Sequence, residues 1–210
     1  MSEQSINIRV ANLDDSESIE ELFSAVFGGS RANGTYPWLF FDGPRAGISV
    51  VAESEGHIVG HAGSVTRALQ YGNQELLMGT SVDAMTHPGW QKRGINRLLA
   101  QRLIEENCRK GIHVFGGFSN ENSTYSALKY QGRSSLGTVP LLVRPLKILT
   151  RPWRILSRST EEFSSQELHW PEDMDTLCSL VSVAGMGSRR DPEYLKWRYR
   201  RPGGIYHLVE

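Results

Sequence analysis

The chain has few cysteines and no excess of charge of either sign. Cys108 and Cys178 are the only cysteines among its 210 residues, which is too few for a disulfide framework. No spacing of Cys and His typical of a zinc site occurs either. Lys plus Arg and Asp plus Glu each number 23, whereas a nucleic-acid-binding domain usually has a basic excess. We therefore expect neither a metal centre nor a nucleic-acid partner.

Long hydrophobic runs are also missing. No apolar stretch approaches the roughly 20 residues that a membrane-spanning helix needs. The opening residues Met1–Ser5 are polar and lack the apolar core of a signal peptide. Together with the small number of cysteines, these features favour a cytoplasmic protein without a membrane span.

Two common nucleotide-binding motifs are absent as well. The sequence contains no G-x-x-x-x-G-K-[ST] run and no G-x-G-x-x-G after an early strand. The first absence argues against a P-loop site, and the second argues against a Rossmann dinucleotide site. An anion site, if the chain has one, must therefore be built in another way.

One turn in the middle of the chain does suit an anion. An apolar run, Leu76–Thr86, predicts a strand, and a helix pattern follows from Ile95 to about Lys110. The turn between them contains Gly89 and Gly94 and two cations. A turn at a helix start points free backbone N–H groups in one direction, and the helix dipole adds positive charge there. The place therefore suits a phosphate or a pyrophosphate.

Hydrophobic alternation and turn residues predict an α+β fold. Connections too short for crossovers make the strands between 48 and 86 antiparallel, and the unit 76–118 is a strand–helix–strand crossover. We expect a mixed sheet with helices on both faces, an antiparallel front half and one βαβ unit. The elements are strands 6–10, 48–53, 57–69, 76–86, 112–118 and 136–143, and helices 14–27, 95–110 and about 121–130.

Residues 28–47 are predicted to form a loop, because they are rich in Gly and Pro. The loop also holds aromatic side chains, Tyr36, Trp38, Phe40 and Phe41. Two interpretations stay open: these rings wall a substrate cleft, or they close the core.

The turn resembles a known cofactor loop. Gln91-Lys92-Arg93-Gly94-Ile95-Asn96 follows the pattern Q/R-x-x-G-x-G/A except at its last position, where Asn96 replaces Gly or Ala. This pattern is similar to the acyl-CoA pyrophosphate loop of the GNAT superfamily of N-acetyltransferases, and the order of elements is that of the same superfamily. Residues 85–88 and 117–123 also resemble a bacterial subgroup often found beside genes for cell-surface polysaccharides. The resemblance covers residues 6–146.

The resemblance implies acetyl-CoA as cofactor and an amine as acceptor. In the superfamily the backbone amides of the loop, here Gln91, Lys92, Arg93, Gly94, Ile95 and Asn96, hold the pyrophosphate. The pantetheine arm pairs with the end of the preceding strand, here Ala84, Met85 and Thr86. The acceptor amine then attacks the thioester directly, and an amide near Met85 receives the charge on the carbonyl oxygen.

The catalytic side chains are less clear from the resemblance. The superfamily often places a proton-donating tyrosine at a position that is Leu128 in this chain. Tyr125 lies one helical turn earlier on the same face, so it is our proton-donor candidate. Tyr130 is the second choice. The alternative for Tyr125 is a core or rim aromatic. Asp83 is the one ionisable residue within the strand 76–86, which makes it either a base or half of a structural ion pair.

Asn120 and Asn122 precede or open the short helix before Tyr130. They contact the cofactor in one interpretation and merely cap the helix in the other.

The C-terminal part repeats the pattern of the front. A linker is expected at 147–160, then a strand-like segment 163–169, a helical pattern 171–183, and Trp197 before a Pro-Gly turn and a strand 205–210. We predict an acetyltransferase domain at 1–146 and, at 161–210, a partial second unit or an appendage. Either the chain stops inside a second unit, or this segment packs on the first domain.

Two functions from different classes remain. The first is an acyl-CoA-dependent N-acetyltransferase acting on a small-molecule or peptide amine, with a homodimer as one open assembly. The second is an inactive, regulatory domain that binds coenzyme A without turnover. Acyl transfer from aminoacyl-tRNA is a third alternative, but it requires a basic groove that a chain of zero net charge does not suggest.

Overall fold

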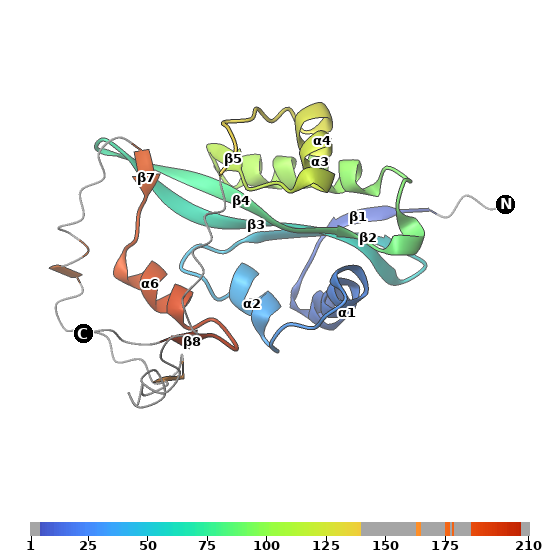
Figure 1. The fold of residues 1–210 in the computed structure, drawn as a ribbon, viewed down its shortest axis with the longest axis horizontal. Helices are drawn as coiled ribbons and strands as arrows, with labels where there is room; N and C mark the ends of the chain where they lie inside the picture. Colours follow the sequence, from blue (N-terminus) through green and yellow to red (C-terminus); the bar gives the residue numbers. More distant parts are fainter. Residues whose placement is uncertain (1–4, 140–162, 165–174, 177, 179–185, 207–210) are drawn as a thin grey trace, which may run out of the picture.

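The computed structural model describes residues 5–139, 163–164, 175–176, 178 and 186–206. Its main sheet has six strands, with β1 to β5 side by side in chain order and β7 added to β3. Figure 1 shows α1, α2 and α6 on one face of this sheet and α3 and α4 on the other. The predicted α+β fold, with a mixed sheet and helices on both faces, is confirmed.

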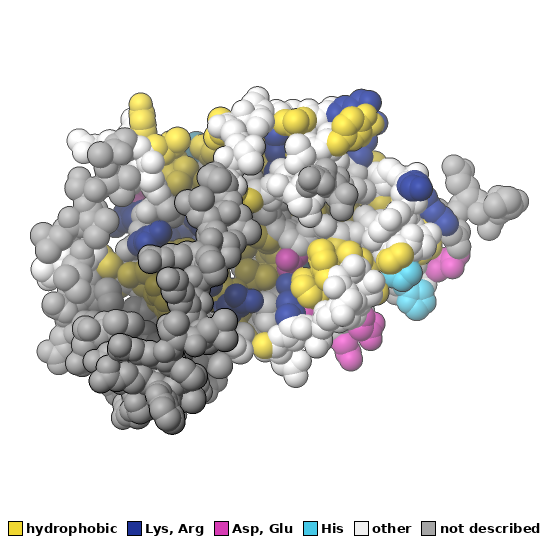
Figure 2. Space-filling view, in the orientation of Figure 1, with side chains coloured by type: hydrophobic (Ala, Val, Ile, Leu, Met, Phe, Trp, Pro, Cys, Tyr) yellow, Lys and Arg dark blue, Asp and Glu magenta, His cyan; other side chains and the backbone are white. Residues whose placement is uncertain are grey.

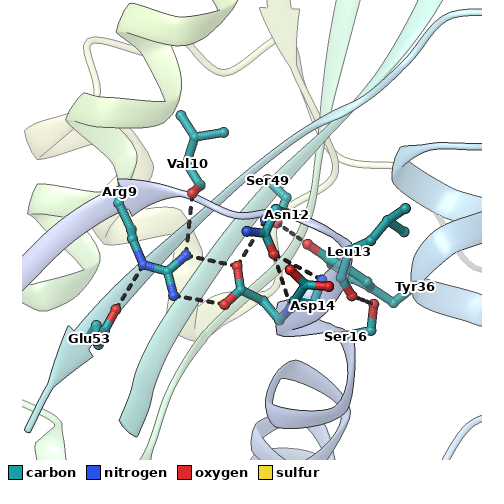
Figure 3. Close-up of polar contacts among 10 residues, drawn as sticks. Arg9, Val10, Asn12, Leu13, Asp14, Ser16, Tyr36, Ser49 and Glu53 are labelled. Carbon is teal, nitrogen blue, oxygen red and sulfur yellow. Dashed lines mark hydrogen bonds and ion pairs between the residues drawn. The ribbon is translucent and has the colours of Figure 1, made fainter. Parts of the chain in front are cut away.

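The chain opens with β1 (Asn7–Val10), a short 3₁₀ turn (Leu13–Asp15) and α1 (Ser16–Phe27). The turn is fixed by a reciprocal cap, since the Asn12 side chain accepts from the backbone N–H of Asp15 and the Asp15 carboxylate accepts from the N–H of Asn12. Arg9 joins the turn to the sheet, because its guanidinium donates to Asp15 and to Glu53 at 2.7 and 2.8 Å (Figure 3). Gly28, with φ of 74°, ends α1.

The loop prediction for 28–47 is wrong at α2 (Thr35–Phe40). Tyr36 and Phe40 lie four residues apart on one helix face, with ring centroids 5.1 Å apart, and both are fully buried. Pro37 is tolerated because it falls in the first turn, where its missing N–H leaves no bond unmade. Of the two interpretations of these aromatics, closure of the core is correct for Tyr36 and Phe40.

The predicted antiparallel meander is confirmed. It consists of β2 (Ile48–Ser54), β3 (His57–Tyr71) and β4 (Gln74–Thr86), and each strand pairs with the next in antiparallel orientation. A helix, α3 (Ile95–Arg109), then crosses one face and leads to β5 (Val114–Gly116), which pairs with β4 in parallel. The βαβ unit is therefore present, and β5 is shorter than the predicted strand 112–118.

Two apolar layers hold the helices on the sheet. On the α3 side, Ile95, Leu99 and Leu103 recur at helical spacing and pack on inward residues of β2 and β3. On the other side, residues of α1 and α2 pack on Val51 and Met85. Full burial of a side chain of this size contributes roughly 1.5–3 kcal/mol, so these layers fix both the position of α3 and the end of β4.

The segment after β5 differs from the prediction. It contains α4 (Glu121–Tyr130) as expected, but residues 136–139 are not a strand, and Leu136 and Val139 are exposed. The strand predicted over 136–143 is therefore wrong at 136–139, and residues 140–143 lie outside the described part. An apolar segment forms a strand only where a neighbouring strand pairs with it, and none of the strands among the described residues pairs with 136–139.

The described C-terminal residues pack on the front of the chain. The strand β7 (Met186–Ser188) pairs with the far end of β3, and α6 (Pro192–Tyr199) lies beside α2 (Figure 1). A separate pair joins β6 (Phe163–Ser164) to β8 (Ile205–Tyr206). The linker predicted at 147–160 lies outside the described residues, as do most of the strand-like segment 163–169 and of the helical pattern 171–183.

No helix within the described residues has the length and apolar character to span a bilayer. The same part of the chain contains no cluster of three or more His, Cys, Asp or Glu suited to a metal ion.

Candidate functional site

The end of β4 has a neighbour on one side only. It pairs with β3 as far as Thr86, but with β5 only over Met78–Thr80. The two parallel strands are still close at the next position, since a Cβ on Gly117 would lie 3.3 Å from the Cβ of Ser81. Beyond it, residues 82–86 have no second strand beside them in the described part of the chain. An open strand edge therefore runs along Ala84, Met85 and Thr86.

A bulge lies at the start of this open edge. Gly63 pairs with Val82 and His61 pairs with Met85, so β4 has one residue more than β3 between these pairs. Asp83 takes the left-handed conformation, with φ of 51°. A bulge bends its strand and increases the local twist, so it helps to turn the end of β4 away from β5.

The backbone of Thr86 faces the open edge. The N–H of His87 donates to the carbonyl of Val59 on β3 at 2.9 Å, and successive strand residues point their backbone groups to opposite sides. The N–H and C=O of Thr86 therefore point away from β3. The Gln91 side chain reaches back and donates to that carbonyl at 3.3 Å.

The turn after β4 places several amides at the start of α3. Lys92 and Gly94 have positive φ, 64° and 80°, which is the backbone geometry of amide nests that bind anions. Ile95 is buried and anchors the helix start, while Asn96 is exposed. No hydrogen bond between described residues uses the N–H of Lys92, Gly94, Ile95 or Asn96. These amides are therefore available to a ligand.

The amide of Gln91 differs from these. It donates to the carbonyl of Pro88 at 3.4 Å, within the short 3₁₀ turn Pro88–Trp90. Of the amides predicted to hold a pyrophosphate, the later ones are therefore better placed than Gln91.

Cationic side chains surround the amide turn. Lys92, Arg93 and Arg97 are exposed, and the guanidinium of Arg93 lies over the Trp90 ring at 4.6 Å. The N-terminal end of the α3 dipole adds positive charge at the same place. The turn thus combines directed amides with a positive field, as a pyrophosphate site requires.

Asp83 points its carboxylate at an arginine. Arg31 donates to Asp83 at 2.6 Å and to Glu20 at 2.7 Å, and its guanidinium lies over the Phe23 ring. Burial lowers the pKa of Arg31, but the bonds to Glu20 and Asp83 outweigh burial and raise it overall. This is the geometry of a structural ion pair, so Asp83 could act as a base only after leaving Arg31. In Figure 2 acidic, basic and hydrophobic side chains meet between the sheet and α1.

Tyr125 is exposed on α4, on the other face of the sheet. Its hydroxyl accepts a hydrogen bond from the Lys129 ammonium at 2.6 Å, and this bond is the main cause of the raised pKa of Lys129. The ring centroids of Tyr125 and Tyr130 are 6.1 Å apart, and the guanidinium carbon of Arg97 lies 6.0 Å from the Tyr130 centroid. The face of α4 that bears Tyr125 therefore approaches the start of α3 through Tyr130.

The asparagine ahead of α4 acts as a cap. Asn120 accepts from the N–H of Ser123 at 3.0 Å, and Ser123 Oγ accepts from the N–H of Asn120 at 3.1 Å. The cap uses the carbonyl oxygen of the Asn120 side chain. The side chain of Asn122 lies outside the described part of the structure.

Two cavities lie close to these elements but outside the open edge. The larger, of about 490 Å³, lies between α2 and α6 and is lined by Trp38 and Trp197 among others. The smaller, of about 370 Å³, lies between α1 and the turn that contains His87 and Trp90. No residue of β5 or of the turn 91–96 lines either cavity, so neither replaces the open edge as the candidate site.

Two residues around the bulge were not predicted from the sequence. Arg31 holds the side chain of Asp83, and His61 hydrogen-bonds its backbone carbonyl. Arg31 is a lone cation in a glycine-rich stretch, and its partner is 52 positions away. His61 does leave a signal, because it is an ionisable residue between small or apolar residues over positions 58–65 of β3.

Solved structures share this architecture. An aminoglycoside acetyltransferase from an uncultured soil metagenomic sample, in complex with sisomicin, is 19% identical, with 68% of this chain and 97% of that chain covered and a TM-score of 0.54. The structure of AAC(6')-Iy with the bisubstrate analogue CoA-S-monomethyl-acetylneamine is 17% identical, covering 68% and 99%, with a TM-score of 0.54. Glucosamine-6-phosphate N-acetyltransferase from Arabidopsis thaliana is 10% identical, covering 67% and 99%, with a TM-score of 0.52. At these identities the likeness shows the fold.

A search of curated proteins finds no match to the chain. A family model, in contrast, covers β1 to α4 and thus every element of the candidate site. Residues 7–131 match the model described as "Acetyltransferase (GNAT) domain". Since this match spans more than half of the 210 residues, the protein belongs to the GNAT acetyltransferase family.

Proposed function

We propose that the protein transfers an acetyl group from acetyl-CoA to an amine by direct attack of the amine on the thioester. The observation that carries this proposal is the open edge of β4, which leads straight into the amide turn at the start of α3. An extended cofactor arm and its pyrophosphate need these two features next to each other.

The residues of the turn would hold the phosphates. The free N–H groups of Lys92, Gly94, Ile95 and Asn96 supply directed donors, and the exposed Lys92, Arg93 and Arg97 supply charge. Asn96 carries a side chain where the family pattern has Gly or Ala, but it is exposed and its amide can turn toward a phosphate.

The end of β4 would hold the acyl arm. Along the open edge formed by Ala84 to Thr86, the backbone groups that point away from β3, those of Thr86 among them, would pair with an extended arm as a further strand does. When bound, acetyl-CoA supplies the electrophilic thioester. A backbone N–H at this edge stabilises the charge that develops on the carbonyl oxygen.

Acyl transfer needs an acid and a base, for which the candidate side chains are Tyr125 and Asp83. The acceptor amine must lose a proton, and the leaving thiolate must gain one. Tyr125 is exposed, and its hydroxyl proton stays available because Lys129 donates to its oxygen. It is our candidate for the acid. Asp83 is held by Arg31, so we infer that a water molecule, rather than this carboxylate, takes the amine proton.

The experiment has two stages. Calorimetry with coenzyme A and acetyl-CoA measures whether the cofactor binds, and thiol release from acetyl-CoA across an amine panel measures transfer. The panel includes sisomicin and glucosamine 6-phosphate, because similar folds bind or act on such amines. We expect binding and amine-dependent thiol release. Binding without release on any amine would support an inactive CoA-binding domain, and absence of binding would refute both readings.

A further inference from the structure

A chain of four hydrogen-bonded groups runs through the core and ends at the bulge of β4. His61, in β3, is fully buried and uses both ring nitrogens. Its Nδ1 lies 2.7 Å from the carbonyl oxygen of Asp83, and its Nε2 lies 2.8 Å from Ser49 Oγ in β2. The hydroxyl of Tyr36, in α2, donates to the same Ser49 oxygen at 3.0 Å (Figure 3).

The direction of every bond in this chain follows from its last acceptor. A carbonyl oxygen cannot donate, so Nδ1 of His61 carries the proton that meets Asp83. Nε2 is then unprotonated and accepts a hydrogen bond from the Ser49 hydroxyl. The Ser49 oxygen in turn accepts a hydrogen bond from the Tyr36 hydroxyl. Burial keeps the two titratable members of the chain neutral, because it lowers the pKa of His61 and raises that of Tyr36 to about 12.

The Ser49–His61 pair has the spacing of a nucleophile and its base, but it has no access to a substrate. Ser49 is 3% exposed and His61 is completely buried, and the rings of Tyr36 and Phe40 pack edge-on against the imidazole. A buried network of this kind, with every member satisfied, fixes the geometry around it.

The geometry that it fixes is that of Asp83. A residue with a Cβ rarely adopts φ of 51°, and such a conformation persists only where the surroundings hold it. Asp83 is held at both ends, because Arg31 binds its carboxylate and His61 binds its carbonyl oxygen. The bond to His61 turns this carbonyl into the core, and the next residues, Ala84 to Thr86, then form the open edge.

We propose that His61 is a positioning residue for acyl transfer, which holds the bulge so that the end of β4 presents its backbone to the thioester. This inference rests on the proposed function. His61 touches neither cofactor nor acceptor, and it acts through the carbonyl of Asp83.

Two substitutions separate the two bonds of His61. The side-chain amide nitrogen of Asn reaches the place of Nδ1 and can donate there, whereas the side-chain carbonyl oxygen of Gln reaches the place of Nε2 and can accept there. His61→Asn therefore keeps a donor for Asp83 and loses the bond to Ser49, whereas His61→Gln keeps a partner for Ser49 and loses the bond to Asp83. Both leave a smaller or more flexible side chain in the same buried site, so each is a control for the other.

The readouts are Tm, the Kd of acetyl-CoA by calorimetry, and kcat and KM of transfer. We expect His61→Gln to lower kcat by about tenfold or more and His61→Asn by less than about threefold, at similar Tm, since small misplacements of reacting groups have effects of this size. Equal losses of kcat in both variants, or losses that follow Tm, would overturn the inference.

A measurement on the unsubstituted protein keeps the inference testable if either variant fails to fold. Nitrogen NMR of labelled histidine should show His61 with Nδ1 protonated and Nε2 unprotonated at neutral pH. The reverse tautomer would overturn the inference. Failure of the unsubstituted protein to bind acetyl-CoA would instead refute the proposed function on which the inference rests.

Discussion

Trp38 and Trp197 hydrogen-bond each other reciprocally. The indole N–H of Trp38 donates to the carbonyl of Trp197 at 2.9 Å, and the indole N–H of Trp197 donates to the carbonyl of Trp38 at 2.8 Å. The two rings stack with centroids 4.8 Å apart, and both residues are buried. This pair joins α2 to α6 across 159 positions of sequence, so the described C-terminal helix is part of the same packed unit.

The first prediction concerns this pair. Trp197→Phe removes one indole donor and leaves the Trp38 carbonyl buried without its partner, which should cost about 1–3 kcal/mol in the free energy of unfolding. Urea unfolding measures the loss. Trp90→Phe is the control, because Trp90 is half-buried and its indole donates no hydrogen bond within the described residues. An equal effect of both substitutions would contradict the role given to the pair.

The second prediction concerns stability at acid pH. The pKa of His61 is lowered in the folded state, mainly by burial, so the unfolded chain takes up a proton first as the pH falls below about 6.5. Stability should therefore fall with pH from that point. The pKa of Asp15 is also lowered, mainly by its bond from Arg9, and the stability that this bond provides is lost below about pH 4.

Urea unfolding at pH 7.5 and pH 5.5 tests the histidine effect. The loss of stability between these values should shrink in His61→Asn and persist in His57→Asn, because His57 is exposed. A pH dependence that is unchanged in His61→Asn would show that another group is responsible.

The third prediction concerns Asp83. Asp83→Asn keeps a residue that tolerates the left-handed conformation but removes the charge that faces Arg31. We expect a loss of about 1–3 kcal/mol in stability, since a bond to a charged group is weakened. We also expect kcat to stay within about tenfold, because general-base catalysis is worth about 10²–10⁴-fold and this carboxylate is already paired. A fall of kcat by a hundredfold or more in a folded Asp83→Asn protein would identify it as the base.

The fourth prediction concerns Tyr125. Tyr125→Phe removes the candidate acid while leaving an exposed ring on α4, so Tm should change little. We expect kcat to fall by about tenfold to a hundredfold with KM for acetyl-CoA nearly unchanged. Tyr130→Phe tests the second choice of acid, whose ring lies beside Arg97, and we expect it to leave kcat nearly unchanged. If both substitutions leave kcat unchanged, the proton comes from water.

Much of the fold was predictable because its signals are local. The apolar runs of β2 and β4, the tight turns at Gly56 and Gly72, and the apolar stripe of α3 each lie within one stretch of sequence. The helix α2 was missed because Gly34 and Pro37 suggest a loop, and only burial of Tyr36 and Phe40 makes six residues stay helical. The strand predicted at 136–143 is wrong at 136–139, because no strand among the described residues pairs with this segment and an apolar segment alone does not supply a partner.

The candidate site was predictable in part. The turn 91–96 was predictable because a glycine often marks a position where the backbone takes positive φ, and Gly94 does have positive φ. No residue type in the sequence indicates the bulge at Asp83, because the bulge depends on the pairing register between β3 and β4. Its partners Arg31 and His61 come from distant positions, so only the folded structure brings them together.

The central claim is that the amides at the start of α3 bind the pyrophosphate of acetyl-CoA. Gly94 and Gly111 offer a matched pair, because they lie at the two ends of α3, have φ of 80° and 69°, and would each place a new Cβ in open space. Alanine at either position should cost a similar amount of stability, roughly 1 kcal/mol. Only Gly94→Ala disturbs the amide turn.

Calorimetric titration of acetyl-CoA into the unsubstituted protein and these two variants is the most direct test. We predict binding by the unsubstituted protein and by Gly111→Ala, and at least about tenfold weaker binding by Gly94→Ala. Equal affinity in all three proteins, or no binding by the unsubstituted one, would contradict the account.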